Sequence, residues 1–126
     1  MIPVAVPEPL PAVLPAFGGL ANDRMIRIGG LSPADGETIT VTTELGSTVY
    51  ECDVDELGVA PGHVAITSTD WSAGICIAEG VMLALSGGPQ ATQFTAVQDG
   101  FDVDLTVLTC SVLTLATTDG ATFMLL

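Results

Sequence analysis

The stretch from Gly36 to Leu85 decides the fold, and it reads GETITVTTELGSTVYECDVDELGVAPGHVAITSTDWSAGICIAEGVMLAL. Polar and apolar residues alternate over Thr38–Thr42, which turns one face of a β-strand toward a core. Gly46 offers the positive φ of a hairpin turn before a second strand over Val49–Val54, and a third strand is expected at Val64–Ile66. We expect the first two strands to pair.

An amphipathic helix should follow, beginning at Trp71. Apolar residues recur at spacings of four and three, the period of one helix face, at Trp71, Ile75, Ala78, Met82 and Leu85. Polar residues at 68–70 can cap the first turn, and the Gly-Gly-Pro run at 87–89 ends the helix. Because internal Gly74 and Gly80 each cost about 1 kcal/mol relative to Ala, we expect packing on a sheet to hold this helix, with Trp71 as its anchor.

The C-terminal third is expected to add two hairpins. Asp99–Gly100 forms the turn of the first, and its second strand alternates Phe101, Val103, Leu105 and Val107 with polar residues. Asp119–Gly120 joins Val112–Thr117 to Ala121–Leu126 in the second, whose apolar ending would be buried in a sandwich or lie at a subunit contact. With a short strand carrying Ile26 and Ile28, these elements predict a mostly β, α+β fold of antiparallel hairpins packed on a single helix.

Residues 1–20, MIPVAVPEPLPAVLPAFGGL, are expected to form an extended Pro-rich arm ahead of a single domain over residues 21–126. The five prolines favour polyproline II geometry and exclude a helix that spans a membrane. The arm also lacks the cationic region and the unbroken apolar core of an export signal. We therefore expect no membrane contact and no export.

The large apolar side chains of the arm need a surface to cover them: Val4, Val6, Leu10, Val13, Leu14 and Phe17. A segment made only for reach would be rich in Gly and Ser or charged, so we expect these six residues to bind another protein. Burial at about 1.5–3 kcal/mol each would give roughly 10 kcal/mol before the ordering costs of association. The alternative is an arm that folds back on its own domain.

Charge limits the partners of this chain. Fifteen acidic residues face only Arg24 and Arg27, with no lysine, and the formal net charge is -13. Non-specific DNA binding depends on Lys and Arg that neutralise phosphates, so nucleic acid is excluded as a partner. Hydrophobic residues make up 48%, too many for a disordered acidic tail, so the carboxylates should coat a folded body.

No pattern predicts a metal or a cofactor. Cys52, Cys76 and Cys110 lie far apart without the spacing of a zinc or redox site, so we expect buried thiols and folding in a reducing compartment. The run DVDELG at 53–58 is similar to the start of a calcium loop. However, Leu57 and Val64 stand where ligands are needed, so we interpret the run as a solvated acidic turn.

No pattern predicts an enzyme either. His63 is the only histidine, and no nucleophile motif accompanies it, which favours a polar residue at a strand edge. Asp102 and Asp104 share one face of a strand and could in principle divide acid and base roles. Their spacing is that of an ordinary outward face, so we expect them to be solvated.

Several motifs together resemble a module of tailed-phage virion proteins. They lie at Thr38–Thr42, Tyr50–Asp53, Gly62–Thr67, the helix from Trp71, and Leu113–Ala121. The resemblance implies a small α+β unit of hairpins packed on one helix, found in capsid-associated, neck and tail proteins, that binds other virion subunits. None of the matching positions is catalytic in that family.

Among such roles we expect a head decoration or cement protein that binds the outer surface of the shell, and hence the major capsid protein, through its arm. An acidic body would be repelled by packaged DNA inside the shell and solvated outside it. We also expect a homo-oligomer, with a trimer as the hypothesis taken from decoration proteins generally, that folds in the host cytoplasm before it joins the virion. The alternatives are a tail, neck or fibre-base subunit and, from another class, an acidic cell-surface binding module.

Overall fold

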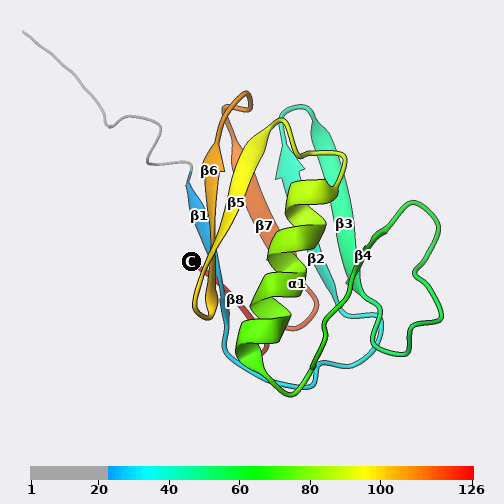
Figure 1. The fold of residues 1–126 in the computed structure, drawn as a ribbon. Helices are drawn as coiled ribbons and strands as arrows, with labels where there is room; N and C mark the ends of the chain where they lie inside the picture. Colours follow the sequence, from blue (N-terminus) through cyan, green and yellow to red (C-terminus); the bar gives the residue numbers. More distant parts are fainter. Residues whose placement is uncertain (1–22) are drawn as a thin grey trace, which may run out of the picture.

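Eight strands form two four-stranded sheets, and one helix packs against both (Figure 1). This computed structural model describes residues 23–126. Its elements are β1 (Arg24–Ile28), β2 (Thr38–Thr43), β3 (Gly46–Cys52), β4 (Val64–Ile66), α1 (Gly74–Gly87), β5 (Phe94–Asp99), β6 (Asp102–Val107), β7 (Leu113–Thr117) and β8 (Phe123–Leu125). The predicted fold class, mostly β with one helix, is confirmed.

One sheet has the strand order β4-β3-β2-β7. The predicted hairpin of β2 and β3 is confirmed, with Gly46 at its turn at a φ of 137°. Ile39 and Val41 of β2 are fully buried, while the threonines between them face outward, as the alternation predicts. β4 pairs parallel to β3, so this strand departs from the expected all-antiparallel arrangement.

The other sheet has the strand order β5-β6-β1-β8. The hairpin of β5 and β6 turns at Asp99–Gly100 as predicted, with Gly100 at a φ of 64°. The strand that carries Ile26 and Ile28, β1, lies between β6 and β8 and is antiparallel to both. Phe101 does not join the alternation of β6, because that strand begins at Asp102 and the Phe101 side chain is largely exposed.

The predicted hairpin around Asp119–Gly120 is wrong. β7 pairs with β2 in one sheet, and β8 pairs with β1 in the other. Asp119 instead organises a tight turn between the sheets: its carboxylate accepts hydrogen bonds from the backbone N–H and the hydroxyl of Thr122. The apolar C-terminal strand is therefore an edge strand, with Phe123 buried and Met124 exposed.

The helix α1 begins at Gly74, three residues later than predicted, and ends at Gly87 as expected. Ala73 is its N-cap and provides no side-chain hydrogen bond, so the predicted capping by residues 68–70 is wrong. Asp70 instead accepts hydrogen bonds from the N–H and the hydroxyl of Ser72, in the turn ahead of the helix. Trp71 lies in that same turn and packs against the core.

The buried face of α1 also differs from the predicted stripe. Its large buried residues are Ile77, Val81 and Leu85, together with small Ala78 and Gly80. Ile75, expected on this face, is 55% exposed. Side by side with the two sheets, this face of the helix closes one core that includes Ile26, Ile39, Tyr50, Leu105 and Phe123.

Candidate functional site

The predicted partner-binding residues lie outside the described part of the chain: Val4, Val6, Leu10, Val13, Leu14 and Phe17. The structure does describe the residues that follow the expected arm, from Asp23 onward. The chain passes from Asp23 directly into β1, an interior strand of its sheet. Met25 exchanges two backbone hydrogen bonds with Leu126, at 3.0 and 2.9 Å, so the last residue of the chain reinforces the same place.

A shallow hollow of about 410 Å³ lies beside the start of β1. Met25, Leu105 and Leu126 contribute its apolar lining, and Asp23 and Asp104 contribute two carboxylates. The hollow therefore lies where the described part of the chain begins.

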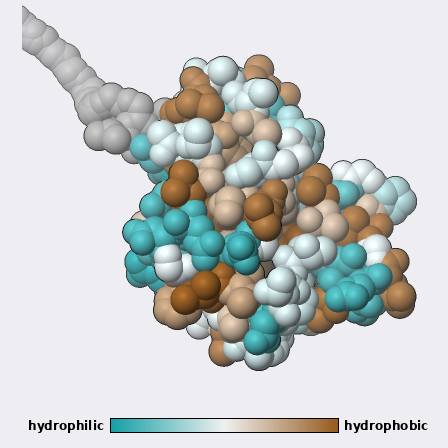
Figure 2. All heavy atoms as spheres, viewed as in Figure 1, coloured by the Kyte–Doolittle hydropathy of each residue, from teal (hydrophilic) through white to brown (hydrophobic). Residues whose placement is uncertain are grey.

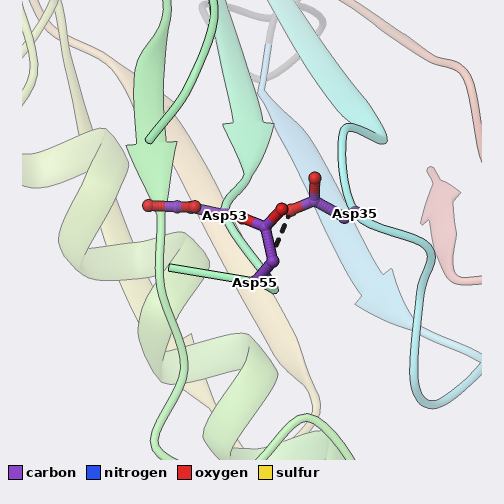
Figure 3. Close-up of side chains that lie close together, drawn as sticks. All are labelled: Asp35, Asp53 and Asp55. Carbon is purple, nitrogen blue, oxygen red and sulfur yellow. Dashed lines mark hydrogen bonds between the residues drawn. The ribbon is translucent and has the colours of Figure 1, made fainter. Parts of the chain in front are cut away.

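Three carboxylates gather beside the DVDELG loop, which follows β3. The side chains of Asp35, Asp53 and Asp55 lie close together (Figure 3), with one oxygen of each within 4.8 Å of the others. Asp35 comes from the loop between β1 and β2, a contribution that the local sequence pattern did not predict. Oxygens in such a group could ligate a hard cation such as Ca²⁺.

Backbone hydrogen bonds already engage these carboxylates. Asp35 Oδ1 accepts from the N–H groups of Val54 and Asp55, at 2.8 and 3.2 Å. Asp53 Oδ1, in a buried side chain, accepts from the N–H of Gly58 at 3.1 Å, and Asp55 Oδ1 accepts from the N–H of Leu57 at 2.9 Å. The group therefore acts as a brace that fixes the loop backbone.

His63 stands at the end of the same loop and pairs with Glu51 of β3. Its Nδ1 lies 2.7 Å from Glu51 Oε1, which also accepts the N–H of Ala60 at 3.2 Å. Glu51 therefore binds both ends of the turn over residues 60–63 and holds this turn against β3. The hydrogen bond of His63 has a structural role in this arrangement. No serine or cysteine of the described residues is hydrogen-bonded to His63 as a nucleophile would be.

Asp102 is half-buried in an ion pair. Arg27 of the neighbouring strand β1 binds both of its carboxylate oxygens, at 2.8 and 3.2 Å. This bidentate hydrogen bond from Arg27 lowers the pKa of Asp102 below its usual value. A carboxylate held ionised by a fixed cation is a poor proton donor near neutral pH.

Two of the three cysteines are buried, as predicted. Burial raises the pKa of the Cys52 thiol to about 12, and the carboxylates of Glu37 and Asp119 add to this effect. Burial also raises the pKa of Cys110, whose Sγ lies 3.2 Å from the carbonyl oxygen of Gln93. Both thiols stay protonated near neutral pH and are weak nucleophiles. Cys76 is only partly buried, contrary to the prediction.

Large apolar side chains gather at the surface at the opposite end of β1 from the arm. We call Leu31, Ile75 and Phe101 the foot patch; each is more than half exposed. The sequence pattern did not predict this cluster, since the alternation placed Ile75 and Phe101 on buried faces. A signal was present, however: Leu31 is an apolar residue inside the turn-forming run GGLSPADG, and Phe101 directly follows the Asp99–Gly100 turn.

Comparisons with known proteins found no match to this chain among protein-family models, curated proteins or solved structures. Over residues 23–126, the structure contains no helix that is long and apolar enough to cross a membrane.

Proposed function

We propose that this chain is a non-enzymatic structural protein of a phage virion, and specifically a head decoration protein. Its N-terminal arm attaches it to the outer surface of the head shell, and its acidic body faces the solvent. The sequence motifs that resemble the virion module favour this class. The strong acidity favours a position outside the shell, because packaged DNA would repel the body.

One observation carries the proposal: the apolar arm leads into a strand that is held on both sides. β1 pairs with β6 over Arg24–Arg27 and with β8 over Ile26–Ile28. A force that pulls the arm along the strand therefore acts on the backbone hydrogen bonds to both β6 and β8 at the same time. An arm joined to an edge strand or a loop would detach more easily, so this junction suits an attachment under mechanical load.

The proposal predicts that deleting residues 1–20 abolishes binding to purified heads that lack this protein. The six apolar side chains supply the binding energy, so loss should be near complete in a sedimentation assay. Circular dichroism and thermal melting show whether the truncated body remains folded. A truncated, folded protein that binds heads as well as the full chain would contradict the proposal.

A full-length variant separates side-chain loss from shortening. Replacing Val13, Leu14 and Phe17 with Ser keeps the arm's length and all of its prolines, and should weaken head binding strongly. Peptide counting on purified virions tests the choice of role. A decoration protein is present in many copies on the shell, a tail or neck subunit in few, and a cell-surface module in none.

A further inference from the structure

The foot patch unites three segments that are distant in the sequence. Leu31 comes from the loop between β1 and β2, Phe101 from the turn between β5 and β6, and Ile75 from the first turn of α1. Their side chains are 56%, 53% and 55% exposed, respectively. Figure 1 shows the three segments at the same end of the body, and Figure 2 shows apolar atoms reaching the surface near it. Large exposed apolar clusters with a polar rim mark interaction sites.

Hydrogen bonds to the backbone hold the three segments of the patch in place, while the exposed ends of its side chains are free to rotate. A Cβ placed at Gly74 would lie 2.8 Å from Cδ1 of Phe101 and 3.7 Å from Cδ2 of Leu31, so both side chains lie against the start of the helix. The Phe101 carbonyl oxygen accepts the N–H of Ile28 at 2.9 Å. Gln98 Nε2 donates to the carbonyl oxygens of Ile75 and Gly100, both at 3.0 Å. A preformed surface of this kind loses little freedom when it binds a partner.

The negative charge of the body limits which segments can bind the foot patch. Of the 15 acidic residues, all but Glu8 lie in the described body, and Asp99 and Asp102 flank Phe101. A second acidic body would be repelled from this surface, as would a nucleic acid. Residues 1–20 carry Glu8 as their only charged side chain and are rich in apolar residues. They can approach the patch at almost no electrostatic cost and need the apolar surface that it offers.

We propose that the foot patch binds the N-terminal arm of a neighbouring copy of this chain. β1 runs from the arm's root toward the patch, since Arg24 lies across from Leu105 and Ile28 is hydrogen-bonded to Phe101. The described chain therefore begins at the end of β1 that lies opposite the patch. Each copy gives an arm at one end and receives one at the other, which is a head-to-tail arrangement that closes into a ring or a small cluster.

The length of the arm allows it to contact both shell and neighbour. Twenty residues in polyproline II geometry span roughly 60 Å, whereas the five residues of β1 span roughly 17 Å. The arm is long enough to contact the shell surface and to reach the foot patch of the next copy. This inference rests on the proposed function only in that the arm binds other molecules, and it adds a second copy of the chain to the shell as one of them.

The test measures self-association of the full chain by sedimentation equilibrium, without heads. Wild type should associate. The double variant Leu31→Ser with Phe101→Ser should remain monomeric at concentrations at least tenfold above those at which wild type associates. The matched control changes two exposed leucines elsewhere, Leu57→Ser and Leu108→Ser, which are 87% and 58% exposed, and should associate like wild type. An excess of a synthetic peptide of residues 1–20 should dissociate the wild-type assembly.

A photo-crosslinker in place of Phe17 identifies the receiving surface even if the patch variant fails to fold. In a mixture of isotope-labelled and unlabelled full chains, crosslinks should join different chains and map to the segments that carry Leu31, Ile75 and Phe101. A monomeric wild type, crosslinks within one chain, or crosslinks to another surface would overturn the inference.

The head-binding assay keeps the two proposals apart. If the full chain binds heads through its arm but remains monomeric, the inference about the foot patch fails and the proposed function stands. If it associates through the patch but never binds heads, the proposed function fails and the patch contact stands.

Discussion

Two glycines of α1 make close contacts of opposite kinds. Gly80 lies in the buried face of the helix, where an added Cβ would collide with the backbone carbonyl oxygen of Thr67, just after β4. Gly74 lies at the start of the helix, where an added Cβ would meet the ring of Phe101, a half-exposed side chain. We call the first contact the helix seam; the second belongs to the foot patch.

The difference shows which part of the body is able to adapt. At the helix seam the partner of the glycine is main chain that the sheet holds in place, so any extra atom must displace a whole element. At the foot patch the partner is the end of a side chain, which can rotate. The core is therefore a rigid support, and the foot patch is a surface that can adjust to an incoming segment without cost to the fold.

The largest effect is expected from Gly80→Ala. Alanine improves helix propensity by about 1 kcal/mol, but its Cβ cannot fit against Thr67, and overpacking of this kind costs about 3 kcal/mol. The net loss of about 2 kcal/mol should lower the melting temperature by roughly 8 °C. Gly87→Ala is the matched control, because a Cβ there meets no atom within 4 Å. Equal melting temperatures for the two variants would show that the seam is not rigid.

Alkaline pH tests the same interior by a second route. Burial raises the pKa of Tyr50 and of Cys52 to about 12, whereas in the unfolded chain these groups ionise near their ordinary values of 10 and 9. Below pH 9 both groups are protonated in either state and the folded state keeps its full stability. As the pH rises further, only the unfolded chain ionises, so stability should fall by roughly 2 kcal/mol by pH 10.

Chemical denaturation at several pH values measures this loss. In the variant Cys52→Ala the decline should be shallower, because only Tyr50 and Cys110 then contribute. An unchanged slope in that variant would mean that the Cys52 thiol is not protected from ionisation. The Tyr50 hydroxyl also donates to Gln90 Oε1 at 2.9 Å, which holds it in its protonated form.

The sequence predicted those parts of the fold that depend on residues close together along the chain. The β2–β3 and β5–β6 hairpins follow from alternating residues and from Gly46 and Gly100, both of which adopt a positive φ. Asp119–Gly120 has the same two residues as the Asp99–Gly100 turn, but it makes a different turn. Gly120 does not adopt a positive φ, and the bonds from Thr122 to Asp119 direct the chain into the other sheet. Local composition alone does not distinguish these outcomes.

The contacts that the sequence did not predict join distant segments or involve glycine. β1 pairs with β8, and β2 with β7, across most of the chain, and no local pattern specifies these partners. The helix stripe was misplaced because Gly74 and Gly80 carry no hydrophobic signal, although both are buried. Shifting the face toward these glycines exposes Ile75. The foot patch exists only where two loops meet the first turn of α1, so the local signals at Leu31 and Phe101 do not show that these residues lie together.

The smallest effect on stability, and the most informative for function, is expected from Gly74→Ala. The new Cβ would push the Phe101 ring outward, while the first turn of the helix gains propensity, so the free energy of unfolding should change by less than about 0.5 kcal/mol. Self-association of the full chain should nevertheless weaken, because the rearranged ring no longer offers the same surface to the arm. Melting curves and sedimentation equilibrium on one preparation measure both. If Gly74→Ala lowers stability as much as Gly80→Ala, the foot is as rigid as the seam and cannot adapt to an arm.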